Sequence, residues 1–371
     1  MKKLSDVCTK GTSNIAQKDL DARNGCYPIY GASGFIKNVD FYHQEQPYIA
    51  IVKDGAGVGR VMQLPAKSSV IGTMQYIIPN EGVSVEYLAY ALEHMNLSKY
   101  YLGAAIPHIY FKDYCNEPLP NHSEEEQENI ANTLKLIDNM ISLRKQQLSK
   151  LDELVKSRFI ELFGDPVDNP KNYLVKSLQE LIDMGYITYH LDGNHGGDYP
   201  RSEEFVDSGV PYIGANSIVN GKIDFSMAKF LTAERAGKLR KGIAQNDDVL
   251  FAHNATVGPT VVLKTTEPKV ILSTSLTAYR CDKSRLLPNY LKTYMQSDGF
   301  VRQYSGEMKQ TTRNQVPITA QKKYLFLVPP IVEQTQFAVF VEQTDKTKLA
   351  IQQSLEKLET LKKSLMQQYF G

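Results

Sequence analysis

Two long stretches of the chain place apolar residues at alternating intervals of four and three, the spacing of a helix that buries one face. The first follows Ser123 and reaches Gly164 with no glycine or proline between them, and the second follows Pro330. Glu126 stands three residues after Ser123, which is the capping-box signal of a helix start. The pattern predicts two helices of about 40 residues, rods of roughly 60 Å that cannot satisfy their apolar stripes alone.

These stripes predict a helix-pairing and partner interface. The second stripe is the weaker one because Thr344, Lys348 and Lys362 fall on it. The apolar positions are Ile130, Leu134, Ile137, Ile141, Leu148, Leu151, Val155, Leu162, Val341, Ile351, Leu355, Leu358 and Leu365.

The two stretches repeat each other at a fixed offset of 207 residues. Glu126-Gln127 matches Glu333-Gln334, and Phe163-Gly164 matches Phe370-Gly371. The globular parts before them match more loosely but in the same order, so the chain is an internal duplication. Because each predicted helix finds a near-copy of itself within one chain, we expect the two to pair antiparallel about a pseudo-twofold axis. Two unrelated coiled-coil tails, used for homodimerisation, are the alternative.

Each globular part mixes short strands and helices. Residues 48–52 and 249–252 are typical of buried strands, and a short helix is expected at 85–97 and at 288–296. We therefore predict an α+β fold, with two mixed α/β domains in tandem, each followed by a long helix. The expected boundaries are 1–121 for the first domain, 122–171 for the central helical spacer, 172–329 for the second domain and 330–371 for the C-terminal helical spacer.

Composition and charge narrow the possible functions. A content of 42% hydrophobic and 22% charged residues is typical of a globular protein, without the apolar runs of a membrane span or signal peptide. The four scattered cysteines form no CxxC pair, which favours reduced thiols and a cytoplasmic location. The net charge is +1, with −3 in residues 122–171 and +4 in residues 172–329. A protein that grips DNA alone usually has a larger basic excess, so a partner would have to neutralise much of the phosphate charge.

The sequence contains no recognisable catalytic constellation. It lacks the GxxxxGK[ST] loop, the Gly-x-Ser-x-Gly elbow and the Asn/Asp-Pro-Pro-aromatic tetrapeptide of amino-methyltransferases. The glycine-rich residues 54–59 fail the dinucleotide-binding pattern, because Arg60 stands where a third glycine is needed. His190 and His195 lie in a segment, 190–198, that could hold a metal ion but is more typical of a flexible loop. We therefore expect no catalytic residue and no metal, which favours a recognition module.

Basic and aromatic residues gather after each short helix. In the second copy they are joined by Gln, Thr and Asn side chains, which read base edges, whereas Lys and Tyr suit phosphate contacts. Any one of these residues is more typical of a polar surface loop, but the same position in both copies favours nucleic-acid contact. The candidates are Lys99, Tyr100, Tyr101, His108, Tyr110 and Lys112 in the first copy, and Arg302, Tyr304, Lys309, Gln310, Thr311, Thr312, Arg313 and Asn314 in the second.

The chain resembles the specificity subunits of Type I restriction–modification systems over essentially its whole length. Residues 247–258 are similar to the family's Gly-Asp-hydrophobic-Leu-Phe…Val-Gly stretch, with Asp247 in place of the usual glycine and His253 in place of the usual arginine. Residues 329–334 resemble the Pro-Pro-x-x-Glu-Gln start of its helical regions, and the leucine-rich helix ending at 163–165 is typical of it. The first copy departs from this start. The resemblance adds His253 and Asn254 to the candidate DNA-binding residues.

The resemblance implies two target-recognition domains separated by helical spacers that act as a ruler, each domain reading one half of a split double-stranded DNA site. It also implies two methyltransferase subunits docked on the helices for adenine methylation, and restriction/translocase subunits beside them. S-adenosylmethionine, ATP and magnesium would be bound by those partners, and no cofactor by this chain. Because the loop residues of the two copies differ, we predict two different half-sites. The alternatives are a subunit of a methylation-only or phage-defence system, a non-catalytic coiled-coil scaffold and an autonomous enzyme.

Replacing Arg313 with alanine is expected to weaken or relax recognition at one half-site only, by about 1–3 kcal/mol, because Arg can pair with both major-groove acceptors of guanine. Binding to DNA with each half-site altered in turn measures the effect. An equal loss on specific and random DNA would identify a phosphate contact instead, and no loss would remove Arg313 from the site.

Overall fold

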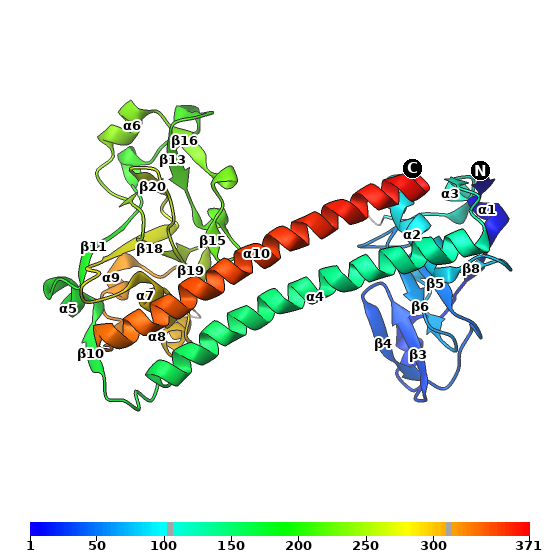
Figure 1. The fold of residues 1–371 in the computed structure, drawn as a ribbon, viewed down its shortest axis with the longest axis horizontal. Coiled ribbons are helices and arrows are strands. Elements are labelled where there is room, and N and C mark those ends of the chain that lie inside the picture. The colour runs from blue at the N-terminus through cyan, green and yellow to red at the C-terminus, as the bar shows by residue number, and fades with distance from the viewer. Residues whose placement is uncertain (102–106, 309–313) are drawn as a thin grey trace. The chain divides into compact units, whose positions relative to one another are not determined.

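The computed structural model describes residues 1–101, 107–308 and 314–371. It contains two compact units (Figure 1): unit 1 comprises residues 1–147 with 351–371, and unit 2 comprises residues 148–350. Two helices of 40 residues, α4 (Glu124–Phe163) and α10 (Ile331–Phe370), each contribute one segment to unit 1 and one segment to unit 2. The architecture is the predicted α+β fold of two tandem globular parts, each followed by a long helix.

Among the described residues, the globular part of unit 1 contains three sheets. A four-stranded antiparallel sheet has the order β2 (Cys8–Thr12), β8 (Met74–Pro79), β5 (Tyr48–Val52) and β6 (Val61–Leu64). A three-stranded sheet has the order β4 (Gly34–Val39), β3 (Tyr27–Gly31) and β7 (Ser69–Val70), and the third sheet pairs β1 (Lys2–Lys3) with β9 (Pro118–Leu119). The helices are α1 (Leu4–Val7), η1 (Gln17–Leu20), α2 (Val85–Met95), η2 (Leu97–Tyr100) and α3 (Phe111–Tyr114).

The globular part of unit 2 is larger. Its four-stranded antiparallel sheet has the order β11 (Ile187–Asp192), β21 (Leu276–Cys281), β18 (Val249–Asn254) and β19 (Thr256–Val262). A five-stranded sheet has the order β12 (Phe205–Val206), β16 (Lys229–Leu231), β13 (Val210–Ile213), β20 (Val270–Leu272) and β17 (Ile243–Ala244). Two-stranded sheets join β10 (Leu174–Ser177) to β22 (Leu325–Val328) and β14 (Ile218–Val219) to β15 (Lys222–Ile223). The helices are α5 (Leu178–Asp183), η3 (Gly196–Asp198), η4 (Ser202–Glu204), η5 (Ala215–Ser217), η6 (Phe225–Met227), α6 (Ala233–Lys238), α7 (Pro288–Met295), α8 (Asp298–Met308) and α9 (Ile318–Gln321).

The strand order shows that the duplication extends to the globular parts. The order β2-β8-β5-β6 in unit 1 corresponds to β11-β21-β18-β19 in unit 2. Each unit also has one parallel pair in its second sheet, β3 with β7 and β13 with β20. The two globular parts therefore share one topology although their sequences are only loosely similar. Unit 2 differs from unit 1 by additional strands between β11 and β18.

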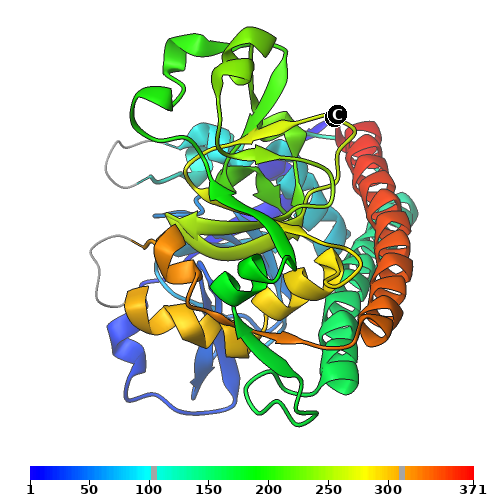
Figure 2. The ribbon, with the colours of Figure 1, turned by 90° about the vertical axis from the view of Figure 1, so that its left-hand side faces the viewer.

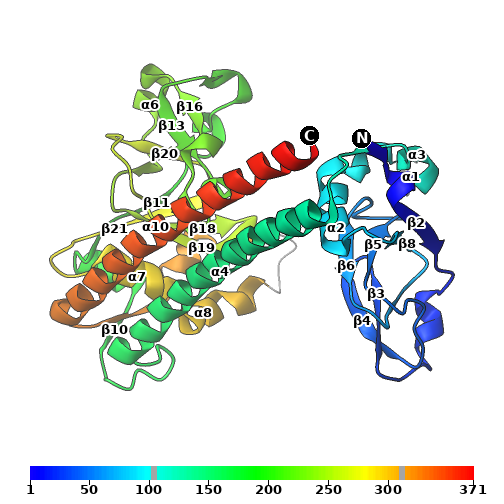
Figure 3. The same cartoon turned by 45° about the vertical axis from the view of Figure 1, so that its right-hand side comes forward.

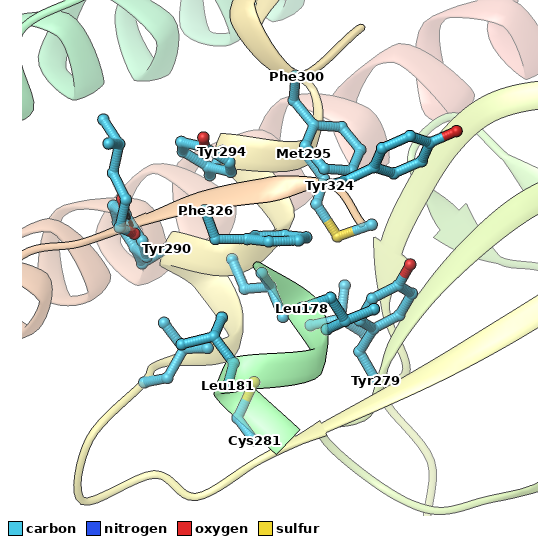
Figure 4. Close-up of a cluster of buried hydrophobic side chains, with 14 of the residues drawn as sticks. Leu178, Leu181, Tyr279, Cys281, Tyr290, Tyr294, Met295, Phe300, Tyr324 and Phe326 are labelled. Carbon is cyan, nitrogen blue, oxygen red and sulfur yellow. Dashed lines mark hydrogen bonds between the residues drawn. The ribbon is translucent and has the colours of Figure 1, made fainter. Parts of the chain in front are cut away.

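In each four-stranded sheet one inner strand, β5 in unit 1 and β18 in unit 2, is buried on both faces. This burial explains the run of apolar residues in each of these strands. In β5, Ile49 and Ile51 pack in a cluster that includes α2, whereas Ala50 and Val52 pack with the three-stranded sheet. The alternation follows from the two-residue repeat of a strand. Figure 3 shows the ribbons of α2, β5, β3 and β4 in unit 1. Unit 2 has the same two layers around β18, and Figure 4 shows the aromatic side chains of its helix-side core.

The two long helices lie side by side in both units (Figure 2). In unit 1 the Nζ of Lys362 lies 2.7 Å from Asp138 Oδ1, and in unit 2 the Nζ of Lys348 lies 2.6 Å from Asp152 Oδ1. Within unit 1, Lys145 also pairs with Glu359, so later residues of α4 meet earlier residues of α10 and the segments are antiparallel. None of the predicted apolar seam positions is exposed.

Two equivalent buried glutamines fasten the long helices to the globular parts. Gln127 accepts the backbone N–H of Ser84 at the start of α2 (3.1 Å) and donates to the carbonyl oxygen of His122 (3.1 Å). Gln334 accepts the N–H of Leu287 at the start of α7 (2.8 Å) and donates to the carbonyl of Pro329 (2.8 Å). The repeated Glu-Gln pair therefore has a structural purpose: its glutamine satisfies backbone groups at helix starts that have no partner within the helix.

Candidate nucleic-acid interface

The turn that follows the central strand of each unit is tied to the segment that carries predicted DNA-binding residues. In unit 1, Gly55 donates its N–H to the carbonyl oxygen of Pro107 (2.8 Å), and Ile109 donates to the carbonyl of Lys53 (2.9 Å). In unit 2, the N–H of Ala255 donates to Asn314 (3.0 Å) and that of Val316 to His253 (2.8 Å). We call this two-bond connection the bridge. Its presence in both units brings the glycine-rich turn and the predicted contact segment into one candidate site.

The bridge requires an unusual backbone at one turn position. Gly55 has φ +86° and the equivalent Ala255 has φ +64°, a left-handed conformation that costs an L-residue about 1–2 kcal/mol. Such strain is commonly retained at functional sites. The turn at residues 54–59 joins the antiparallel strands β5 and β6, and this agrees with the rejection of a dinucleotide-binding loop.

In unit 1 the predicted residues separate into an exposed and a tethered set. Tyr101 and Tyr110 are 57% and 50% exposed, and the exposed Lys112 places its Nζ 5.3 Å from the centre of the Tyr110 ring. His108 lies against the same ring, with 5.0 Å between centroids. This aromatic and cationic group suits contact with bases or phosphates.

Lys99 and Tyr100 of unit 1 are held by an internal carboxylate. Lys99 pairs with Glu117 at 2.5 Å, and the Tyr100 hydroxyl donates to the same carboxylate. Partial burial alone would raise the pKa of Glu117, but hydrogen bonds from these two side chains hold that pKa below its usual value. Contact with DNA by Lys99 or Tyr100 would therefore compete with an interaction already formed inside the protein.

In unit 2 some predicted residues lie at the surface and some do not. Arg302 and Asn314 are exposed and Asn254 is half-buried. His253 and Tyr304, however, are only 1% and 3% exposed, so in this structure their side chains offer almost no surface for direct contact with DNA. Five further candidates lie outside the described residues, and for them the sequence prediction stands alone: Lys309, Gln310, Thr311, Thr312 and Arg313.

A buried polar network lies beneath the bridge of unit 2. Gln321 accepts hydrogen bonds from His190 Nε2 (3.1 Å) and from the Tyr279 hydroxyl (2.6 Å), and donates to the carbonyl of Val316 (3.2 Å). His253 donates from Nδ1 to the same carbonyl (3.1 Å). His190 lies on β11 and is 8% exposed, so the expectation that it belongs to a flexible loop is wrong. Sequence reasoning missed Gln321, because one glutamine in a four-residue helix carries no periodic signal.

Unit 2 is expected to lose stability as the pH falls from about 6.5 to about 4. Burial lowers the pKa of His190 from 6.5 to about 4, so below pH 6.5 the unfolded state binds a proton that the folded state does not. The loss ends near pH 4, where the folded state is also protonated, and the interval corresponds to about 3 kcal/mol. Urea unfolding across this range measures it. A His190→Gln variant should show a much shallower pH dependence, and an unchanged dependence would assign the effect to other groups.

The described part of the chain shows neither metal ligation nor a membrane span. Within residues 1–101, 107–308 and 314–371, no three His, Cys, Asp or Glu side chains are grouped so that they could hold a metal ion. His195 instead pairs through Nε2 with Asp192 Oδ2 at 2.7 Å. No helix among the same residues is long and apolar enough to cross a membrane.

Comparison with known proteins gives a consistent family match. Residues 1–153 and 170–361 match the Type I restriction modification DNA specificity domain. The chain is 23% identical over 356 residues to the Type I restriction enzyme MjaVIII specificity subunit of Methanocaldococcus jannaschii, a match that covers 90% of this chain and 81% of that protein. The MjaIX specificity subunit of the same organism is 27% identical over 165 residues, which cover 39% of this chain and 36% of that protein.

Solved structures share the fold. The crystal structure of the Type I restriction–modification S subunit from M. genitalium gives a TM-score of 0.64 at 14% identity, covering 100% of this chain and 95% of that one. A chain from a structural study of complex assembly and conformational transition in the type I system gives a TM-score of 0.55 at 16% identity, covering 100% and 96%. At these identities the likeness concerns the fold alone.

Proposed function

The chain belongs to the Type I restriction–modification DNA specificity family, and we propose that it reads a two-part, asymmetric DNA sequence and directs adenine methylation by docked methyltransferase subunits. As a specificity subunit it is the DNA-recognition component and not the catalyst. Each unit would read one half-site through its bridge and the neighbouring exposed side chains. Two methyltransferase subunits and restriction/translocase subunits would supply the chemistry, with S-adenosylmethionine, ATP and magnesium bound by them.

The observation that carries this proposal is the bridge, which recurs in both units with different side chains around it. In unit 1 it is surrounded by the aromatic and cationic group of His108, Tyr110 and Lys112, whereas in unit 2 it presents the amides Asn254, Asn314 and Gln315. Amide side chains pair with adenine edges, and aromatic and basic groups favour stacking and phosphate contact. The same frame with unlike surroundings fits two half-sites of different sequence.

Sequencing methylated adenines in genomic DNA from cells with and without the gene tests the proposal. We expect a split, asymmetric motif that disappears when the gene is deleted. Exchange of residues 172–329 for the corresponding domain of another specificity subunit should change one half of the motif and leave the other half intact. An unchanged methylome on deletion would contradict the proposal. If the assembled complex shows no salt-dependent gel shift with DNA, a protein scaffold would be favoured over a DNA reader.

A further inference from the structure

Residues 240–242 of unit 2 form a loop whose backbone is held in place by a buried side chain. Asn194 is only 3% exposed; its Nδ2 donates to the carbonyl oxygen of Lys241 (2.7 Å) and its Oδ1 accepts the N–H of the same residue (3.3 Å). Two glycines allow this approach, since a Cβ on Gly242 would lie 2.8 Å from the Cα of Gly193. The two loops therefore pack backbone against backbone, and no side chain larger than hydrogen fits between them.

This loop pair lies at the same edge of the four-stranded sheet as the bridge. Asp192, Thr277 and Phe251 face one another across β11, β21 and β18, so the loop after β11 begins near the point where β18 reaches His253. His253 in turn carries the bridge through its carbonyl oxygen. Burial lowers the pKa of His253, and the charges of Asp192 and His195 act on the same ring, which agrees with their proximity.

The loop carries two positive charges at the surface. Arg240 and Lys241 are exposed, and neither side chain has an ion-pair partner among the described residues. The neighbouring cations differ: Lys238 pairs with Glu234 (2.8 Å), and Arg235 pairs with Glu204 (2.5 Å). Because the backbone of the loop is already ordered, binding an anion would restrict only the two side chains and not the loop itself.

We propose that Arg240 and Lys241 contact DNA phosphates and extend the DNA interface of unit 2 beyond the residues around the bridge. This inference rests on the proposed function, because it requires DNA at the bridge. Asn194 holds the backbone that carries both cations at the same edge of the four-stranded sheet as the bridge. Phosphate contacts of this kind fix the register of a protein on the duplex while the bridge residues read bases.

The test uses the complex of this chain with its methyltransferase partners and compares the double variant Arg240→Gln/Lys241→Gln with Lys238→Gln. Lys238 lies in the same segment, but its charge is already paired, so it is the matched control. Affinity for cognate and random DNA is measured from 50 to 200 mM salt. For the double variant we expect a similar fold-loss on both DNAs and a salt slope that is shallower by about one for each phosphate contact removed. The conservative variant Arg240→Lys/Lys241→Arg should restore the wild-type slope.

Three outcomes would overturn the inference. An affinity and salt slope equal to those of Lys238→Gln would show that the loop does not touch DNA. A change in the recognised sequence at one half-site, with the slope unchanged, would make these residues base readers. Failure of the conservative variant to restore the slope would point to altered folding of the loop. If the wild-type complex shows no preference for any sequence, the proposed function fails, and that result is separate from the comparison of variants.

Discussion

Replacing Phe163 with alanine is expected to lower the free energy of unfolding of unit 2 by about 3–5 kcal/mol. Phe163 is the last residue of α4 and is 1% exposed. Its ring centroid lies 4.8 Å from that of Tyr290 and 5.6 Å from that of Phe337, both nearly edge-on. Truncation removes these contacts and leaves a cavity among rigid aromatic neighbours that cannot collapse to fill it. Hydrogen exchange followed by mass spectrometry should show faster exchange in unit 2.

The duplication supplies the matched control, Phe370→Ala. Phe370 is the equivalent last residue of α10, is 8% exposed and lies 5.3 Å from the ring of Tyr87, which corresponds to Tyr290. Its truncation should accelerate exchange in unit 1, so the final turn of the chain would protect strands that begin near residue 8. If either variant accelerates exchange equally in both units, the two units do not unfold separately and this assignment of contacts is wrong.

The helical part of the fold could be predicted from the sequence because helix burial is periodic and local. Ile130 and Leu134 of the first stripe are buried. The polar residues of the second stripe, Thr344, Lys348 and Lys362, are buried or half-buried and therefore also face inward. Thr344 is 6% exposed, and its hydroxyl donates a hydrogen bond to the carbonyl oxygen of Phe340 (2.9 Å). A polar residue can therefore occupy this seam position without an unsatisfied hydroxyl group. Where the pattern weakened, the periodicity still gave the correct face.

The site could be predicted only in part, because its geometry depends on contacts distant in sequence. His253 and Tyr304 have polar neighbours in the sequence, which predicts a surface position, but His253 on β18 and Tyr304 on α8 are both buried. No local sequence pattern marks the Arg240–Lys241 loop, because its order depends on Asn194, 47 residues earlier. Asp247 shows the opposite case: the resemblance indicated a position usually occupied by glycine, and the aspartate there has φ +71°. The aspartate therefore adopts a left-handed backbone conformation that glycine would adopt at lower cost.

Replacing Arg280 with methionine is expected to destabilise unit 2 by about 3–5 kcal/mol, since it leaves a carboxylate buried without its counter-charge. The Asp248 side chain is 1% exposed and accepts two hydrogen bonds of 2.8 Å from Arg280, one from Nε and one from the terminal NH₂ group. The carboxylate also raises the pKa of the arginine, mainly through this hydrogen bonding. Asp248 is the aspartate of the family stretch, so the pair gives that residue a structural role. Urea unfolding at pH 7 measures the loss.

Two comparisons separate the buried charge from other costs of the substitution. The double variant Arg280→Met/Asp248→Asn should recover part of the stability, because no unpaired charge remains and the N–H of Gln245, now 2.9 Å from the carboxylate, can still find an acceptor. Lys264→Met removes a cation that is 70% exposed and pairs with Asp247, so its effect should stay within about 1 kcal/mol. If Arg280→Met costs no more than Lys264→Met, Asp248 does not depend on its ion pair. If the double variant is as unstable as the single one, the cost comes from lost packing of the guanidinium, which lies 4.7 Å from the centre of the Tyr189 ring.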